Sequence, residues 1–430
     1  MNQTTHQPNH LAQQGNLSAR HYPVLYLALL AIFACLAYVW ILLPPFAFLF
    51  FLVYIPFDFY QAGSHVDYSF ILLEACIAGI AGWISYEMLK LKIDYPAGRP
   101  LTRDEAPDLR IRLEALSKKY NAPQISSIRI VRDCSMELVR TPANGFPFLC
   151  SYSLLIGLPL MQSLDSRYLM TAIEREIISL SVMHKHPATW LCFAGQQWSQ
   201  YQIAWQKSWS ASALMMRAFF SWYAPLYKLL SQSACCMQQY HADQKVHLAL
   251  RDETLVHMLI TANISNHYLK NEFWPNLYSK AYRHKQPPYF PYTSLDHNLR
   301  AKLDEDKAQA WLNAEMKQAS RTSATPTLRQ RLEQLGIYHA DLPPTVTESA
   351  AKYFLGSHLK IIASQLDQIW LKTHEYEWQQ KYQQGLQQQQ QLRSLISQAM
   401  RMCLTNATAW ELIQLSKRYQ DQDHNLPICK

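Results

Sequence analysis

Two long apolar segments near the N-terminus constrain the fold of this 430-residue chain more than any other feature. Residues 23–57 are almost entirely apolar, with Pro44-Pro45 in the middle, and residues 70–91 form a second apolar run. A helix needs about 20 apolar residues to cross the roughly 30 Å hydrocarbon layer of a bilayer. We therefore predict a hairpin of two membrane helices over residues 24–43 and 70–91. A break is expected at the proline pair, followed by an apolar continuation that extends or tilts the first span.

The charges around these segments predict their orientation. Arg20 precedes the first run, Lys90 and Lys92 close the second, and the loop between them carries no Lys or Arg. Because basic residues are retained on the cytoplasmic side, both termini and the main domain are expected in the cytoplasm. Glu74 lies near the start of the second run, where it either faces a partner helix or polar pocket or lies close to the membrane surface.

Composition favours a membrane protein. The chain is 49% hydrophobic and only 17% charged, and its net charge of +8 is spread without a dense Lys/Arg run. This pattern argues against nucleic acid as a partner and favours anionic lipid headgroups. The nine cysteines are scattered, with only Cys235-Cys236 adjacent. That spacing argues against a disulfide framework or a cysteine zinc site, and it fits a reducing compartment.

Patterning divides the chain into four parts. Residues 1–22 are polar, rich in Gln, Asn and His, and predicted to be disordered. Residues 23–92 form the hairpin, residues 93–345 a soluble domain, and residues 346–430 a helical extension. The extension contains a glutamine-rich stretch at 379–391, which we expect to continue the helix, with disorder as the alternative.

Periodicity predicts the elements of the soluble part. A helix is expected to open at residues 101–105 with Thr102 as its cap, and a central helix to run from Ser163 or Asp165 to just before Pro187. The remaining predicted elements are strands at 125–131 and 149–158, a turn at 141–145, an ordered loop at 271–293, a short helix at 328–335, and half of a helical hairpin at 408–419. Residues 210–237 form a long apolar-aromatic helix that either touches the membrane or, as we predict, lies in the core, because Arg217 and Lys228 interrupt it.

The central helix contains a near-match to a zinc-protease motif. It reads Arg175-Glu176-Ile177-Ile178-Ser179 where a metallopeptidase has His-Glu-x-x-His. In that motif the two histidines lie four residues apart on one helical face and hold zinc, and the glutamate activates the zinc-bound water. Here Glu176 is present, but Arg175 and Ser179 replace both histidines.

The order of several segments resembles the membrane-anchored gluzincin zinc metallopeptidases, the family that includes HtpX and the CAAX prenyl proteases. Residues 101–107 resemble the family's stretch after the anchor, and residues 156–160 resemble the strand that leads into the active-site helix. Residues 242–243 resemble the end of the helix with the third zinc ligand, and residues 326–332 resemble a stretch near the end of the catalytic domain. The resemblance implies an α+β, mainly helical fold with a transmembrane helical hairpin, a gluzincin-like metallopeptidase domain with a small sheet, and a C-terminal helical extension. It also implies a bacterial inner-membrane location.

The departures from the family fall on the chemistry. In this alignment Arg175, Ser179 and Gln239 take the places of the three zinc ligands, and Met136-Glu137 replaces an Asn-Ala pair on the substrate-binding edge strand. Zinc needs nitrogen, sulfur or carboxylate donors, whereas arginine is a permanent cation and serine and glutamine are weak ligands. The resemblance therefore implies a site that has lost its metal.

Two features of this region stay open. Arg175 either forms a surface salt bridge with Glu176 or places its guanidinium where the metal would lie. A different metal site would be built from the nearby histidines His184, His186, His241 and His247. Without zinc, Glu176 is a relic of the general base, and Asp243 is expected to remain as a structural hydrogen-bond acceptor.

These features predict a membrane-anchored pseudo-metallopeptidase, catalytically inactive and without a cofactor, that binds membrane lipid and a protein partner or polypeptide. One alternative is an active zinc metalloendopeptidase with an atypical metal site. Another is a structural membrane protein that assembles through its helical tail. The chain has no glycine-rich phosphate loop and no Gly-x-Ser-x-Gly element, which argues against nucleotide-dependent and serine-hydrolase chemistry.

Overall fold

The computed structural model describes residues 22–62, 68–91, 93, 97–143, 146–183, 185–208, 210–302, 305–317 and 326–404. Within these residues the fold is mainly helical with one small sheet, as predicted. The chain forms two compact units: the first combines Met1–Gly157, Arg167–Leu259 and Leu312–Asp341, and the second combines Leu158–Ser166, Ile260–Trp311 and Leu342–Lys430. The predicted polar N-terminus, apart from Tyr22, and the predicted half-hairpin at 408–419 lie outside the described residues.

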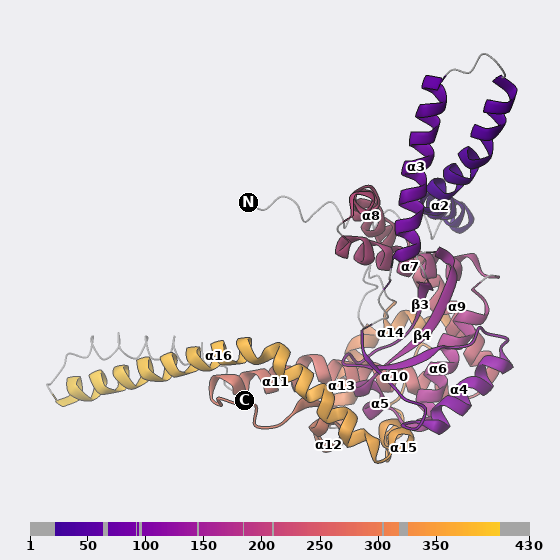
Figure 1. Ribbon diagram of the computed structural model, residues 1–430. Helices are drawn as coiled ribbons and strands as arrows, with labels where there is room; N and C mark the ends of the chain where they lie inside the picture. The colour runs from indigo at the N-terminus through magenta and orange to yellow at the C-terminus, as the bar shows by residue number, and fades with distance from the viewer. Residues whose placement is uncertain are drawn as a thin grey trace. The chain divides into compact units, whose positions relative to one another are not determined.

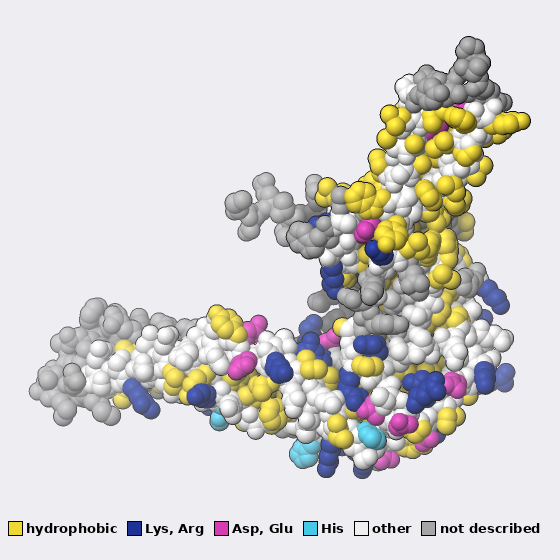
Figure 2. Space-filling model, in the orientation of Figure 1, with side chains coloured by type: hydrophobic (Ala, Val, Ile, Leu, Met, Phe, Trp, Pro, Cys, Tyr) yellow, Lys and Arg dark blue, Asp and Glu magenta, His cyan; other side chains and the backbone are white. Residues whose placement is uncertain are grey.

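The two apolar segments form the long helices α2 (Pro23–Ala62) and α3 (Tyr68–Lys90), which pack against each other (Figure 1). Both are long and apolar enough to cross a membrane, over Pro23–Tyr60 and Ser69–Lys90. Figure 2 shows mostly hydrophobic side chains over this hairpin. The predicted break at Pro44-Pro45 does not end the first helix, since α2 continues through it. Proline inside a helix costs a hydrogen bond and bends the axis without necessarily ending the helix.

The first half of α2 packs into the protein. Its buried residues recur every three or four positions, which is helical spacing, and join a core with α7 (Pro187–Lys207) and α8 (Ala211–Leu230). These buried residues are Tyr26, Leu30, Ala34, Ala37 and Ile41. The single core helix predicted over residues 210–237 is two helices, because α8 ends at Leu230 and α9 (Gln232–Leu250) follows after Ser231.

The sheet is mixed, with the strand order β1-β2-β4-β3. β1 is antiparallel to β2, β2 is parallel to β4, and β3 is antiparallel to β4. The strands are β1 (Arg99–Pro100), β2 (Ser127–Val131), β3 (Met136–Ala143) and β4 (Phe146–Gly157). The two predicted strands are confirmed as β2 and β4. β3 was not predicted, and it includes the start of the turn expected at 141–145.

The chain leaves the sheet at Gly157. A Cβ atom there would lie 1.9 Å from the carbonyl oxygen of Asp133, so the close approach requires glycine. α5 (Leu158–Ser163) follows directly, and then α6 (Ser166–Ser181), which is the predicted central helix. Its predicted buried face is confirmed for Ile173, Ile177 and Leu180.

The helix expected to open at residues 101–105 begins later, as α4 (Pro107–Lys119), with Ala106 at its N-cap position. Thr102 does not cap it. Instead, the Thr102 backbone N–H donates to the Glu105 carboxylate at 2.9 Å, and Glu105 also pairs with Arg99. Proline is favoured at the first helical position because its fixed φ angle suits a helix, which explains why α4 starts at Pro107.

The second unit packs around the first part of α16 (His358–Leu404), which contains the glutamine-rich stretch in helical form, as predicted. The Asp367 carboxylate on α16 accepts backbone N–H groups of Tyr292 at 2.8 Å and Thr293 at 3.0 Å. The predicted loop at 271–293 is wrong for its first half, which is helical. The other helical elements are α10 (Thr254–Tyr268), a π-helix (Leu269–Phe273), α11 (Trp274–Ser279), a 3-10 turn (Lys280–Tyr282), α12 (Pro291–Lys302), α13 (Glu305–Lys317) and α15 (Ala350–Leu355).

Candidate functional site

Helices α6 and α9 bring most of the predicted site residues together in the first unit. Arg175 and Ser179 lie four residues apart on α6, and therefore on one face, with Glu176 beside them. Asp243 lies on α9, one helical turn after Gln239. The short helix α14 (Leu328–Gln334), which the sequence predicted, packs against α9 and completes the site.

Four charged side chains form one network. Arg175 Nε donates to Asp243 Oδ1 at 2.7 Å, and Arg175 Nη1 donates to Glu176 Oε1 at 3.0 Å. Arg331 on α14 donates from Nε and Nη2 to the two oxygens of Asp243, both at 2.7 Å. We call Arg175, Glu176, Asp243 and Arg331 the charged cluster. The Asp243 side chain is only 1% exposed, and those of the two arginines are 15% and 17% exposed.

This geometry answers two questions that the sequence left open. Asp243 is a hydrogen-bond acceptor, as expected. Arg175 and Glu176 are in contact, but their pair belongs to a largely buried network and is not a surface salt bridge. Arg331 was missed as a site residue, although it lies in the segment 326–332 that carries part of the family resemblance.

The two carboxyl groups of the charged cluster have opposite electrostatics. Burial acts to raise the pKa of Asp243, but the charges of Arg175 and Arg331 outweigh it and lower that pKa below its ordinary value. Burial raises the pKa of Glu176, and Arg175 opposes this only in part. The nearby charge of Glu137 adds to the rise for Glu176. The site thus holds one carboxylate fixed in its ionised form and one carboxyl that binds a proton more readily than usual.

Ser179 and Gln239 provide no strong metal ligand. The Ser179 hydroxyl is buried and donates to the carbonyl oxygen of Arg175 at 3.1 Å. Gln239 is half-buried on α9. Among the residues described by the structure, no group of three His, Cys, Asp or Glu side chains is placed to hold a metal ion. The side chains at the three ligand positions do not fit zinc, because a guanidinium repels a dication and neutral hydroxyl and amide groups bind it weakly.

Strand β3 contributes a further carboxyl group near the charged cluster. Gln196 Nε2 on α7 donates to Glu137 Oε1 at 2.8 Å. The surrounding protein partly desolvates the exposed Glu137 carboxyl and so raises its pKa, and the Lys228 charge opposes this rise. β3 is also an edge strand of the described sheet, the position at which the sequence alignment placed Met136-Glu137.

The histidines offered as a replacement metal site are only partly brought together. The rings of His186 and His241 stack with centroids 4.3 Å apart, and His186 Nδ1 lies 3.2 Å from the Thr189 hydroxyl. Burial lowers the pKa of both histidines, so both rings are neutral at pH 7. His184 lies outside the described residues, and His247 is on α9, six residues beyond His241.

One cysteine pair departs from expectation. Cys192 on α7 and Cys235 on α9 form a disulfide, with their Cα atoms 5.1 Å apart. The spacing along the sequence does not predict this pair because it depends on how two helices pack. A single disulfide is not a framework, but it removes cysteine usage as an argument for a reducing compartment.

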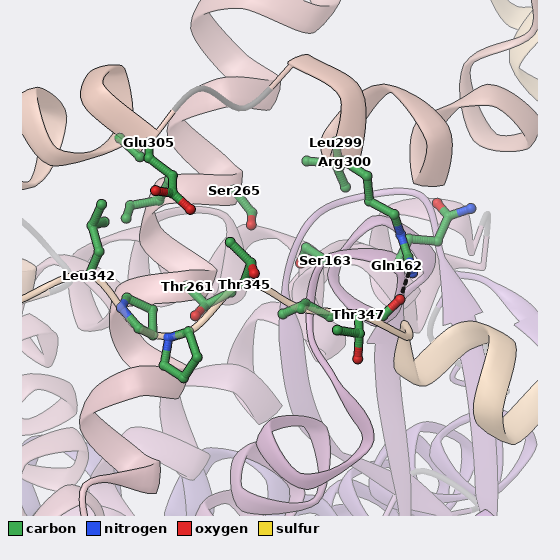
Figure 3. Close-up of a pocket in the computed structure, with 15 residues that line it drawn as sticks. Gln162, Ser163, Thr261, Ser265, Leu299, Arg300, Glu305, Leu342, Thr345 and Thr347 are labelled. Carbon is green, nitrogen blue, oxygen red and sulfur yellow. Dashed lines mark hydrogen bonds between the residues drawn. The ribbon is translucent and has the colours of Figure 1, made fainter.

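The second unit contains a cavity of about 630 Å³ (Figure 3). Its lining combines hydroxyl groups with one cation and one anion, and Figure 3 shows Arg300 and Glu305 on opposite sides of it. The Arg300 guanidinium is held by the Thr347 carbonyl oxygen and by the Asp296 carboxylate at 3.1 Å. None of the predicted site residues lines this cavity.

No protein-family model, curated protein or solved structure matches this chain. The gluzincin resemblance therefore stays a prediction from the order of the sequence segments.

Proposed function

We propose that this chain is a membrane-anchored, gluzincin-like pseudo-metallopeptidase that holds no catalytic zinc and binds a polypeptide partner. The observation that carries the proposal is the charged cluster. Arg175 stands at the position of the first zinc ligand, and its guanidinium is bonded to Asp243 and Glu176. The guanidinium of Arg175 supplies the positive charge that a zinc ion would supply at this position, but it does not activate a water molecule for attack on a peptide bond.

The family assignment gains support from the contacts between distant segments. The helix with the near-match to the zinc motif and two of the four segments chosen for their resemblance, 242–243 and 326–332, meet through Arg175, Asp243 and Arg331. Such convergence is expected if the segments share one ancestral site, and unrelated matches have no reason to converge.

A polypeptide partner is favoured by the first residues of β3, where Glu137 is exposed, whereas the strand from Leu138 to Thr141 is buried and α7 packs against it. β3 lies at the edge of the described sheet, and an edge strand offers backbone groups that an extended polypeptide can pair with. Glu137 on β3 is solvent-exposed and reaches the neighbourhood of Glu176. A partner bound along β3 would therefore lie beside the charged cluster.

We further propose that α2 and α3 anchor the chain in a bacterial inner membrane with the rest of the protein in the cytoplasm. The support is their length and apolar character together with the basic residues that follow α3. Anionic lipid headgroups would complement the net charge of +8.

Metal analysis of the detergent-solubilised protein tests the loss of zinc chemistry. We expect zinc far below one atom per chain and no cleavage of casein. A variant with Arg175→His, Ser179→His and Gln239→Glu restores three ligands and should bind zinc, whereas the same variant with Arg175→Met should not. Stoichiometric zinc in the unaltered protein, with casein cleavage lost in Glu176→Gln, would establish the active metallopeptidase instead.

Photocrosslinking separates partner binding at β3 from assembly through the tail. We would place p-benzoylphenylalanine at Glu137, at Gln390 on the exposed part of α16, and at Ile111 on α4 as a control. The proposal expects polypeptide adducts at position 137 well above those at 111. Adducts at 390 without adducts at 137 would favour a structural protein that assembles through α16.

A further inference from the structure

The contacts within the hairpin define which part of α2 accompanies α3. Gly82 on α3 lies against the ring of Phe48, since a Cβ atom at Gly82 would fall 2.8 Å from that ring. Counting away from this pair in an antiparallel hairpin, Lys90 at the end of α3 is level with residue 40 of α2. The partner of α3 is therefore the second half of α2, and the prolines at 44 and 45 lie near the end of the paired region.

This register changes the membrane span expected from sequence. α3 has 22 residues in its candidate span, about 33 Å of helix, which is enough for the hydrocarbon layer. If α3 spans the bilayer, the membrane surface lies near Lys90, and so near residue 40 of α2. The first half of α2, the predicted span of residues 24–43, then falls at that surface. Figure 1 agrees, with the first half of α2 running past the foot of α3 while the second half runs beside it.

Helix α8 accompanies the first half of α2 in antiparallel orientation. The Tyr26 hydroxyl donates to the carbonyl oxygen of Leu230 at 2.5 Å, and the Tyr223 hydroxyl donates to that of Phe33 at 2.6 Å. The Trp40 ring stacks on Phe219 with centroids 4.9 Å apart. These contacts extend over the 15 residues of α2 from Tyr26 to Trp40, about 21 Å of helix. The first half of α2 and helix α8 therefore share one environment, either lipid or water.

The outer face of the first half of α2 is entirely apolar. One face packs on α7 and α8, and the other carries large exposed side chains at helical spacing. These are Leu25, Leu29, Ile32, Leu36 and Val39, and Ile32 is 70% exposed. Residues 23–43 contain no charged side chain. A soluble protein rarely exposes such a contiguous apolar stripe.

The outer face of α8 is largely apolar, although it also exposes Ser221 and Lys228. Leu214, Met215 and Trp222 are exposed, with Leu214 at 67% and Trp222 at 51%. Arg217 is the one charged residue between positions 211 and 227, and its guanidinium donates to the carbonyl oxygen of Ser208 just before the helix. Lys228 follows near the C-terminal end. Exposed apolar side chains, with one guanidinium drawn back to the start of the helix and one lysine near its end, suit the boundary between acyl chains and headgroups.

We propose that the first half of α2 and helix α8 form a membrane-embedded platform that lies in the plane of the bilayer interface, on the side where α3 ends. The occupant of its apolar face is the headgroup–acyl boundary of the same bilayer that the hairpin crosses. The face is continuous with the hairpin through α2 itself, and α3 also contacts α8. This inference rests on the proposed membrane anchoring.

Lipid photolabelling tests the platform. The full-length protein carries p-benzoylphenylalanine in place of Ile32, Leu214 or Trp222 and is reconstituted into vesicles of phosphatidylcholine and phosphatidylglycerol. Leu52 on the second half of α2 is the membrane reference, and Ile111 on α4, which is 65% exposed, is the aqueous reference. After irradiation, lipid adducts are quantified by mass. We expect positions 32, 214 and 222 to give several times more adduct than 111, and an amount comparable to position 52.

Three other photolabelling results would contradict the platform or the membrane anchor. Lipid adducts at 52 with only background at 32, 214 and 222 would overturn the platform while leaving the membrane anchor intact. Crosslinks from 214 or 222 to a second copy of the chain would show that this face is a protein interface and would also overturn it. Background labelling at 52 itself would refute the membrane anchor on which the inference rests.

Discussion

The charged cluster and the aromatic core between α2, α7 and α8 are two buried regions of the same unit that are held together in different ways. In the charged cluster each contact joins a specific donor and acceptor, as between Arg331 and Asp243. In the aromatic core large rings pack by shape, as where Trp198 meets Tyr38 edge-on with centroids 4.7 Å apart. The first region depends on charge balance, and the second depends on filled volume.

This difference has a practical consequence. A change that keeps volume but removes charge is expected to disrupt the charged cluster and to be tolerated in the aromatic core. A change that removes volume is expected to disrupt the core. The following variants test this contrast in the full-length protein in detergent micelles, by the free energy of unfolding.

The largest effect is expected from Asp243→Asn. The amide keeps the shape of the side chain but leaves Arg175 and Arg331 without their shared carboxylate in a buried setting. Removing one partner of a buried ion pair costs about 3–5 kcal/mol, which we expect as the loss in unfolding free energy. Chemical denaturation followed by circular dichroism measures it.

Two controls accompany this variant. Arg329→Met removes the half-exposed pair with Glu333 on the same helix as Arg331 and should cost about 1 kcal/mol or less. Met216→Leu, a volume-conserving change in the aromatic core, should cost less than about 1.5 kcal/mol. A cost for Asp243→Asn no greater than that for Arg329→Met would remove the contrast between the two regions.

A volume change in the aromatic core comes next. Phe220 on α8 is completely buried, with its ring 5.6 Å from that of Tyr201. Phe220→Ala should lower the unfolding free energy by about 3 kcal/mol, from lost burial and the cavity left behind. A loss below that of Met216→Leu would mean that the core is loosely packed and that volume does not decide its stability.

A single hydroxyl in the aromatic core gives a smaller effect. The Tyr223 hydroxyl donates to the carbonyl oxygen of Phe33 at 2.6 Å and joins α8 to α2. Tyr223→Phe retains the ring and should cost about 1 kcal/mol, the net value of one hydrogen bond. The same thermal or denaturant scan measures it, and a loss equal to that of Phe220→Ala would show that polar contacts dominate here as well.

The smallest effect is a pH dependence that separates the two carboxyl groups of the charged cluster. Burial acts to raise the pKa of Asp243, but the two arginines have the larger effect and lower it. As the pH falls below about 4, the Asp243 carboxylate therefore takes up a proton in the unfolded chain before it does so in the folded protein, and the stability falls. The raised pKa of Glu176 acts in the opposite sense, since the folded state binds its proton first. Between pH 7 and 4.5 the protonation of Glu176 should therefore add stability that Glu176→Gln lacks, while the lowered pKa values of His186 and His241 oppose this gain equally in both proteins. Equal profiles for both proteins would contradict the assignment.

Local patterns predicted much of the fold. The apolar runs gave α2 and α3, and the spacing of Ile173, Ile177 and Leu180 gave the buried face of α6. β3 was missed because it contains Glu137, Arg140 and a proline and does not alternate cleanly, so only its pairing with β4 makes it a strand. The helical first half of the segment at 271–293 was missed because its prolines and aromatic residues resemble a loop.

In the candidate site, too, the sequence predicted the local features and missed a long-range contact. The sequence pointed to Arg175, Glu176, Ser179, Gln239 and Asp243 through their helical spacing and their place in the order of segments. It did not reveal that Arg331, 88 residues beyond Asp243, closes the network. Contacts at such separation follow no local period, so periodicity alone does not find them.

By itself, the sequence determined which stretches of this chain are apolar enough to leave water and which side chains share one face of the central helix, because both depend on residue type and short-range spacing. The tertiary structure decided that α2 bends past its prolines to pack along α8, and that two arginines from distant helices enclose one aspartate. Those outcomes depend on how helices far apart in the chain fill space and balance charge around one another.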